Sequence, residues 1–530
     1  FAVNSANIGT FILDAKGDIR IGRDALDLDS SAFHSLRIFS DAQVFIRETL
    51  ATDIGNIEIT ADVDGDGAAN DQLVLRNSPD LISAADIILN GSASASVGIF
   101  SNGQTLMNAA GTIFINDDFV GNSVAFINAD NGIIINGDFT TNQMVLDGDA
   151  NSSADGIDQI VFADGITVEA NGSTDFITLH KAEALGSVSL LSGSGINFLA
   201  DFTANGAVTI DADTNLAVGS GLFGIAIGAE LNTNNNTLFL RTSEIDLQGT
   251  INVGTSSATI SIAQDGTTRS VFLGDSACIN CLAISGADLQ NITASSLTIE
   301  NLTQGIFVDN VTAANSNNIG TVILSSTTDT FFGGTASTFN ALTVNSKTTV
   351  DVRANITTDV GDLILNADSD GTGGAERIFF VNSPTLTSAG DLTFNSSSGV
   401  GGIDTNNNLT LVATGTINIG DDFTAAGGAT FNAGNGININ GNFTAVSNVA
   451  LDGGVGGPIT FANGVTVEST TGSVSLNSAS SSLGTLTVNA RSGISVNGAF
   501  SASGSTVFNA DSDANGSGLF TVSATGSLLT

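Results

Sequence analysis

The sequence predicts an all-β fold, a single β-solenoid with rungs of about 20 residues and a long tandem repeat of about 300–310 residues. Three observations lead to this prediction. Most of the chain is present twice, a strand-forming motif recurs at a short regular interval, and turn-forming residues separate short alternating segments throughout. A solenoid is extended and modular, because each rung contacts only its neighbours.

The long repeat can be followed directly in the sequence. GNIEITADVDGDGAANDQLVLRNSPDLISAADIILN, beginning at Gly55, matches GDLILNADSDGTGGAERIFFVNSPTLTSAGDLTFN, beginning at Gly361. GTIFINDDFVGNSVAFINADNGIIINGDFT from Gly111 likewise matches GTINIGDDFTAAGGATFNAGNGININGNFT from Gly415. The offset between matched positions falls in small steps along the chain. Each step is a short deletion of the kind that surface loops tolerate.

The repeat also predicts the domain organisation. Matched positions extend from about residue 5 to about residue 215, so residues 1–310 form a first solenoid unit and residues 311–530 a second, incomplete one. Residues 220–310 have no counterpart within the chain, and we therefore expect the whole sequence to belong to a longer protein. No linker or shift in composition separates the units, which predicts a continuous rod.

A shorter rhythm indicates the strands. Phe119 and Phe139 are one expected rung apart, as are Phe423 and Phe443, and each lies in a motif of the form I-x-[IV]-x-G-[DN]-F-T. The alternation of apolar and polar residues predicts strands buried on one face, and Gly, Asn, Asp and Ser between them predict turns. No stretch has the apolar spacing of an amphipathic helix, and a string of separate β-sandwiches would need linkers that the sequence lacks.

Composition excludes several classes of partner. The chain has 31 Phe but no Tyr or Trp, so its aromatic residues serve packing, and a carbohydrate-binding platform is disfavoured. The net charge of −40 argues against nucleic acid and against anionic membrane surfaces, which both require clustered Lys and Arg. No apolar run is long enough to predict membrane insertion. High negative charge also keeps long rods soluble and apart.

Acidic turns provide the candidate ligand-binding residues. Two segments have oxygen-bearing side chains at alternate positions before a glycine, which is how an EF-hand calcium loop begins. These segments are Asp62, Asp64, Asp66 and Gly67, and Asp511, Asp513, Asn515 and Gly516. The sequence therefore identifies the five aspartates and Asn515 as candidate ligands and calcium as the candidate cofactor.

The alternative interpretation is that these are solvated acidic turns. The carboxylate usually found at the twelfth position of the loop is missing, because Leu73 stands there. In the internal copy Asp62 is kept as Asp368, but Asp66 is replaced by Thr372. A third segment, Asp211 to Asn215, has the same alternation without the glycine.

Cys278 and Cys281 are the only cysteines, in the sequence ACINC. A four-thiolate metal site is excluded by their number, and a thioredoxin-like site would need a strand-to-helix context that the sequence lacks. Two alternatives stay open, a local disulfide in an oxidising compartment or a pair of reduced thiols.

The sequence predicts no enzyme. β-Helix polysaccharide lyases and hydrolases use acidic clusters together with basic residues on one exposed face. A loose basic group lies near the beginning of the chain and could fall on neighbouring rungs: Lys16, Arg20, Arg23, Arg37, Arg47 and Arg76. Only Arg47 has a basic counterpart in the copy, Arg353, so no duplicated active site is visible.

The repeated segments resemble those of the large filamentous-haemagglutinin-like and autotransporter-type repeat proteins of bacteria. The resemblance covers nearly the whole chain and rests on runs such as AGDLTFNSSSGVGGIDTNNNLTLVATGTINIGDDFTAAGGATFNAGNGININGNFT. It implies a right-handed parallel β-helix and an exported adhesin or surface fibre. It includes no site motif, so no functional residue follows from it.

We therefore expect a structural segment of a long extracellular fibre or filament on the bacterial cell surface, which joins copies of itself end to end by β-strand pairing. An adhesin is the alternative function. It would bind a host or neighbouring-cell surface, and the unmatched residues 220–310 would carry the recognition. A polysaccharide-active β-helix enzyme is a third and weaker alternative.

Overall fold

The computed structural model describes residues 9–22, 31–66, 71–92, 97–151, 159–172, 175–216, 221–262, 269–275, 278, 280–374, 376–396 and 402–529. The chain divides into two compact units, which are described separately. The first unit comprises Phe1–Thr267 with Asn291–Ala294, and the second comprises Thr268–Gln290 with Ser295–Thr530. The division at residue 310 was predicted from the matched sequences, a different criterion, and it stays a prediction.

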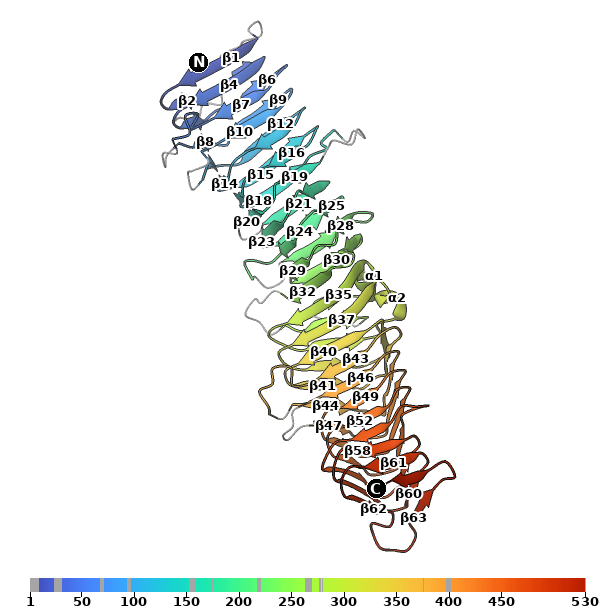
Figure 1. Ribbon diagram of the computed structural model, residues 1–530. Helices are drawn as coiled ribbons and strands as arrows, with labels where there is room; N and C mark the ends of the chain where they lie inside the picture. Colours follow the sequence, from blue (N-terminus) through green and yellow to red (C-terminus); the bar gives the residue numbers. More distant parts are fainter. Residues whose placement is uncertain are drawn as a thin grey trace. The chain divides into compact units, whose positions relative to one another are not determined.

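The fold is a parallel β-solenoid of about 21 turns, with roughly 22 residues per rung and about 2% helix. The all-β solenoid predicted from the sequence is thus confirmed. The average rung is longer than the motif spacing predicts because loops interrupt some turns. Phe119 pairs with Phe139 across an uninterrupted rung, but Phe139 pairs with Val168 across a rung that contains a longer loop. Figure 1 shows the successive strands stacked along each unit.

Each rung of the first unit contributes strands to three faces, A1, B1 and C1, and a strand pairs in parallel with the strand three places further along. Face A1 consists of β3 (Ser31–Phe33), β6 (Leu50–Thr52), β9 (Asp80–Ser83), β12 (Thr105–Ala109), β15 (Val124–Ala129), β18 (Gln143–Asp147), β21 (Phe176–Leu179), β24 (Gly195–Phe198), β27 (Leu222–Ile225) and β30 (Glu244–Leu247). Face B1 consists of β1 (Thr10–Ala15), β4 (Ser35–Ser40), β7 (Ile57–Thr60), β10 (Ile87–Asn90), β13 (Ile113–Ile115), β16 (Ile133–Ile135), β19 (Ile160–Phe162), β22 (Ala182–Ala184), β25 (Phe202–Ala204), β28 (Glu230–Asn232), β31 (Thr250–Asn252) and the beginning of β35 (Ile292–Asn301). The rest of β35, from Ser295, belongs to the second unit. Face C1 consists of β2 (Ile19–Ile21), β5 (Val44–Ile46), β8 (Leu73–Leu75), β11 (Ile99–Ser101), β14 (Phe119–Gly121), β17 (Phe139–Thr141), β20 (Ile166–Ala170), β23 (Val188–Ser192), β26 (Val208–Asp211), β29 (Leu238–Thr242) and β32 (Ser257–Ile262).

The second unit also has three faces, A2, B2 and C2, named by their match to the first. Face A2 consists of β39 (Ser337–Phe339), β42 (Ile356–Thr358), β45 (Thr385–Ser388), β48 (Leu409–Ala413), β51 (Ala429–Ala433), β54 (Val449–Asp452), β57 (Val474–Leu476), β60 (Gly493–Val496) and β63 (Leu519–Val522). Face B2 consists of β37 (Ile319–Ser326), β40 (Leu342–Ser346), β43 (Leu363–Asn366), β46 (Leu392–Asn395), β49 (Ile417–Ile419), β52 (Ile437–Ile439), β55 (Ile459–Phe461), β58 (Ser480–Ser482), β61 (Ala499–Ala502) and β64 (Ser527–Leu529). Face C2 consists of β34 (Leu282–Ile284), β33 (Val271–Gly274), β36 (Ile306–Asp309), β38 (Thr330–Phe332), β41 (Thr349–Val352), β44 (Arg377–Phe380), β47 (Gly402–Thr405), β50 (Phe423–Ala425), β53 (Phe443–Ala445), β56 (Val465–Ser469), β59 (Leu486–Ala490) and β62 (Thr506–Asn509).

The core is formed by the inward positions of these strands. Most strands show alternate burial, so the apolar side chains predicted to face inward do so. Identical residues stack on one another from rung to rung: Phe119 on Phe139 in the first unit, and Phe423 on Phe443 at the matched positions of the second. All four rings are buried. Ladders of this kind stabilise a solenoid because every inward side chain is covered above and below.

Buried hydroxyl groups close one corner of the rung, where face A1 turns into face B1. Thr52 Oγ1 and Ser83 Oγ lie 3.0 Å apart, and both lie within hydrogen-bonding distance of the carbonyl oxygen of Gly55, at 2.5 and 3.1 Å. The corner satisfies polar groups that would otherwise be buried without partners. The second unit has the same network in Thr358, Ser388 and Gly361, with corresponding distances of 3.1, 2.7 and 3.2 Å.

A second corner is also kept in both copies. Asn77 and Ser78 adopt left-handed backbone conformations, with φ of 62° and 57°, directly before Pro79. In the second unit Asn382 and Ser383 have φ of 64° and 57° before a proline. Asn tolerates this conformation better than most residues, and proline then fixes an extended backbone for the next strand.

Two short helices in the second unit were not predicted. α1 (Gly286–Gln290) and α2 (Ala313–Ser316) each follow a local capping arrangement. The Asp288 carboxylate accepts a hydrogen bond from the amide of Ser285 at 2.8 Å, and the Asn315 side chain accepts one from the amide of Thr312 at 2.9 Å. Such S/T-x-x-D/N contacts form a single helical turn without the long apolar period by which helices are recognised in sequence. None of the helices described is long and apolar enough to cross a membrane.

Candidate metal centre

Three carboxylates converge in the first unit at the corner between faces B1 and C1. They belong to Asp62, Asp66 and Asp71, and one oxygen of each lies within 4.8 Å of the others. Asp62 and Asp66 follow strand β7, and Asp71 stands two residues before strand β8. The loop between the strands therefore brings together acids that are separated in the sequence.

The backbone of this loop directs Asp62 toward the group. Asp62 has a left-handed conformation with φ of 57°, and its carbonyl oxygen accepts a hydrogen bond from the Gly65 amide at 3.2 Å. The Ser92 hydroxyl donates to Asp62 Oδ2 at 2.6 Å from the following rung. A carboxylate can accept several such contacts, so this bond orients Asp62 without excluding a further ligand on the same group.

Asp71 is the buried member of the group. Its exposed fraction is 7%, and among the described residues no hydrogen-bond donor and no basic group contacts its carboxylate. Burial raises the pKa of Asp71 above its ordinary value, and the negative charges of Asp66, Asp62 and Asp64 raise it further. Like charges close to a buried carboxylate are unfavourable unless a cation or a proton compensates them.

The structure and the sequence select different ligands in this loop. Asp64, which the sequence identified with Asp62 and Asp66, lies outside the group of three; it is exposed, and its Oδ1 accepts a weak hydrogen bond from the Asp66 amide at 3.4 Å. Gly67 lies outside the described residues. Asp71 was missed because it falls outside the D-x-D-x-D-G pattern. Its replacement by another acid, Glu376, in the copy is the signal that could have identified it.

The matched loop of the second unit keeps two of the three acids. Asp368 corresponds to Asp62 and Glu376 to Asp71, whereas Thr372 replaces Asp66. Asp368 Oδ1 and Glu376 Oε2 are both buried and have no hydrogen-bond partner among the described residues. Asp370, which corresponds to Asp64, accepts hydrogen bonds from the hydroxyl and amide of Thr372, and these bonds lower its pKa.

The second predicted segment forms a self-contained turn. Asp511 accepts hydrogen bonds from the amides of Asn515 and Gly516 at 3.2 and 2.8 Å, and the Asn515 side chain donates to Asp513 at 2.7 Å. Arg491 pairs with Asp513 at 2.5 Å. Within the described part of the chain these residues join no group of three acids. Their oxygens are occupied by the turn and by the arginine, an arrangement that needs no metal.

Asp211 and Asp213 in the third segment are likewise engaged. Arg241 Nη2 contacts Asp211 Oδ2, and the Ser243 hydroxyl contacts Asp213 Oδ2. Both partners come from face C1 or its following turn, one rung further on. These acids hold one rung to the next.

Many other acids accept backbone hydrogen bonds from the adjacent rung. The Asp138 side chain accepts a hydrogen bond from the Thr167 amide at 2.7 Å. Its counterpart Asn442 accepts one from the Thr466 amide at 3.0 Å. A second pair of matched residues, Asp164 and Asn463, also accepts an amide in each copy, at 2.7 and 2.8 Å. The oxygen acceptor is kept while the charge is lost, so a structural role explains these acids.

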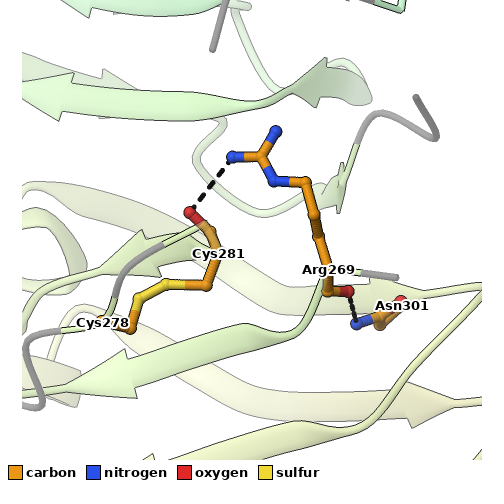
Figure 2. The surroundings of a disulfide bond; sticks show 4 residues. All are labelled: Arg269, Cys278, Cys281 and Asn301. Carbon is orange, nitrogen blue, oxygen red and sulfur yellow. Dashed lines mark hydrogen bonds between the residues drawn. A yellow bond between two sulfur atoms is a disulfide. The ribbon is translucent and has the colours of Figure 1, made fainter. Parts of the chain in front are cut away.

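Cys278 and Cys281 are joined by a disulfide in the second unit (Figure 2). Their Cα atoms are 6.1 Å apart, within the range that a disulfide spans. The buried Arg269 donates to the Cys281 carbonyl at 3.3 Å, and its own carbonyl accepts from Asn301 at 3.0 Å. These bonds connect the Cys281 backbone to β35.

Three arginines of the first unit surround one outward-facing phenylalanine. The guanidinium carbons of Arg20, Arg47 and Arg76 lie 5.0, 5.6 and 5.3 Å from the ring centroid of Phe45, which they cover to 7% exposure. Three of the basic residues noted in the sequence, Arg20, Arg47 and Arg76, thus lie on neighbouring rungs. Arg23 lies outside the described residues. In the second unit Asp351 replaces the phenylalanine and forms three hydrogen bonds with Arg353, the counterpart of Arg47. At this position the surface contacts of the two copies differ.

Protein-family models, curated proteins and solved structures were compared with the chain, and none of them matches it.

Proposed function

We propose that the chain is a structural segment of a long extracellular fibre or filament on a bacterial cell surface. The observation that supports this proposal is a comparison of the two copies: the contacts that shape the core and the corners recur, whereas an outward cluster does not. The stacked phenylalanines, the hydroxyl corner and the Asn-Ser-Pro corner recur contact for contact. The outward cluster of three arginines around Phe45 does not recur, because Asp351 stands at the matched position and pairs with Arg353. Repetition that retains shape and loses surface chemistry fits a scaffold.

Assembly in this proposal uses the same pairing that joins one rung to the next. A strand such as β48 pairs in full register with β51 of the following rung, so terminal rungs of two copies could pair in the same way. The net charge of −40 opposes lateral contact and leaves the ends as the favoured contacts.

Electron microscopy of the purified chain tests the proposal. Rods that lengthen with protein concentration, together with antibody labelling of the protein on the surface of intact cells, are expected. Compact particles, or a protein confined to the cell interior, would contradict it. High salt should promote side-by-side association of the rods, because the repulsion is screened over about 3 Å at 1 M.

A second candidate function, adhesion, is favoured by one feature of face C2. Phe272, Phe307 and Phe331 form an outward, half-exposed ladder, with ring centroids 4.6 and 5.5 Å apart. Phe272 and Phe307 belong to residues 220–310, which have no matched copy in the chain. Partly exposed, pre-ordered rings can bind a partner at low entropic cost. Phe307→Ser should then reduce attachment to host or neighbouring cells, whereas Phe379→Ser, on the same face but under Arg377, should not.

A further inference from the structure

We propose that Asp62, Asp66 and Asp71 bind a calcium ion at the corner between faces B1 and C1. The proposal rests on the convergence of three carboxylates and on the burial of one of them. The proposal does not depend on the fibre or adhesin function. The ion would hold together the loop between two strands of one rung, whatever the solenoid as a whole does.

The first step of the argument concerns Asp71. An ionised carboxylate that is only 7% exposed and lacks a hydrogen-bond donor among the described residues is costly, since buried charges are normally paired or bound to metal. Most acids of this chain avoid that cost by accepting backbone amides, as Asp138 does. Asp71 instead faces two further carboxylates. A cation at the centre would compensate all three charges at once.

The spacing of the oxygens fits calcium. Ca²⁺ binds oxygen ligands at about 2.3–2.6 Å, so ligands on opposite sides of the ion are about 5 Å apart. The three carboxylate oxygens lie within 4.8 Å of one another, which allows one ion to contact all of them. Mg²⁺ requires shorter distances of about 2.0–2.1 Å and near-octahedral geometry, which a loop that supplies three carboxylates meets less readily than the flexible coordination of Ca²⁺. Water would complete the coordination.

The copy provides independent support. Its Asp368 and Glu376 occupy the matched positions, and each has a buried oxygen with no hydrogen-bond partner in the described part of the chain. The third ligand, Asp66, is Thr372 there. The two matched acids were therefore kept through the duplication while the exposed Asp66 was lost. We expect the first unit to bind the ion more tightly, because affinity rises with the number of charged ligands.

Calorimetric titration of the full chain with calcium chloride, after removal of metal by a chelator, tests the proposal. From the first unit we expect a binding event with Kd on the order of 10⁻⁵–10⁻³ M, accompanied by a higher melting temperature, and any binding at the matched loop of the second unit should be weaker. Asp71→Asn should weaken the binding at least about tenfold, the effect expected from the loss of a charged ligand. Asp66→Asn, at an exposed position where folding is not at risk, should also weaken it strongly.

The matched control is Asp64→Asn, which removes a neighbouring acid outside the group. The calcium affinity of this variant should stay within about threefold of that of the wild type, since the substitution removes only a charge outside the group of ligands. Glu376→Gln should leave the tight event unchanged. The proposal is overturned if the wild type binds no calcium at about 10 mM, beyond the weakest range of extracellular calcium modules. It is also overturned if both Asp71→Asn and Asp66→Asn bind like the wild type, or if Asp64→Asn weakens binding as much as they do.

Discussion

The rings of Phe119 and Phe139 stack face to face within the first unit, with centroids 4.7 Å apart and planes 9° from parallel. Their counterparts Phe423 and Phe443 stack at 4.4 Å and 27°. The centroid distance is close to the spacing of hydrogen-bonded strands, about 4.7–4.9 Å, so the backbone ladder itself sets the distance between the rings. Identical aromatic side chains at the same place on successive rungs are therefore packed by the pairing of their strands.

Phe119→Ala should destabilise the first unit by about 3–5 kcal/mol, because it removes a fully buried ring from between two covered rungs. Urea denaturation measures the change in the free energy of unfolding, and native-state hydrogen exchange shows which strands are affected. The exchange should accelerate in β14 and β17 and much less in β28, since rungs interact mainly with their neighbours. The half-buried neighbour Val120 serves as the control, and Val120→Ala should cost less than about 1 kcal/mol. Uniform acceleration across the unit would contradict this local picture.

The hydroxyl corner predicts a coupling between Thr52 and Ser83. Replacing either residue leaves the other hydroxyl with fewer partners, so Thr52→Val and Ser83→Ala should each cost about 1–3 kcal/mol. The double variant should cost less than the sum of the two, because both act on one network. The same cycle at Thr358 and Ser388 should give a similar coupling energy. If the two effects are additive in either unit, the coupling energy between the two hydroxyl groups is zero there, which would contradict the prediction.

The pH dependence of one outward acid can be predicted from its surroundings. Burial raises the pKa of Asp404 above its ordinary value, and the nearby Arg377 offsets part of this shift. Ionisation of Asp404 therefore opposes folding at neutral pH, and this cost disappears below the pKa of the unfolded chain, near 4. Asp404→Asn should raise the urea midpoint at pH 7 and have little effect at pH about 3, where the wild-type carboxyl is neutral.

Asp164 provides the opposite case and the control. Hydrogen bonds from the amide and hydroxyl of Ser187 lower its pKa, so its contribution to stability is present at neutral pH and is lost as the pH falls through the folded-state pKa. Asp164→Asn should therefore not raise the midpoint at pH 7. An equal gain from both variants would indicate a general relief of negative charge and contradict the local explanation of the Asp404 effect.

The disulfide between Cys278 and Cys281 can be tested by the mass that a thiol-blocking reagent adds to the protein. Blocking of free thiols in the native protein should leave Cys278 and Cys281 unmodified, whereas blocking after denaturation in reductant should label both. Mass spectrometry distinguishes the two outcomes. Labelling of both cysteines without reductant would establish reduced thiols, the alternative that the sequence left open.

The sequence could predict the solenoid because its core is periodic. Phe119, Phe139 and the alternating residues before them lie at a fixed spacing, and parallel pairing converts that spacing into contacts. The candidate metal centre could be predicted only in part. Asp62 and Asp66 belong to a recognisable pattern, but Asp71 joins them through a corner whose loop length follows no rule. Residues that a loop brings together have no regular spacing in the sequence, so their contact cannot be recognised from periodicity.

The contact partners of surface residues could not be predicted for a related reason. Arg20 pairs with Phe45 on the next rung, and Phe45 pairs with Val74 on the rung after that. Both intervals are longer than the spacing of the strand motif because of intervening loops. An outward residue can therefore be assigned a neighbour only when the length of every loop between them is known.

The exchange of Asp138 for Asn442 without loss of the amide hydrogen bond has a consequence for the whole chain. Aspartate and asparagine differ there by one terminal group, and both supply the oxygen that the next rung requires. Surface potential can therefore change one rung at a time while the backbone geometry stays fixed. The attraction or repulsion between neighbouring solenoids is then an adjustable property, set by a few side-chain termini and independent of how each solenoid folds.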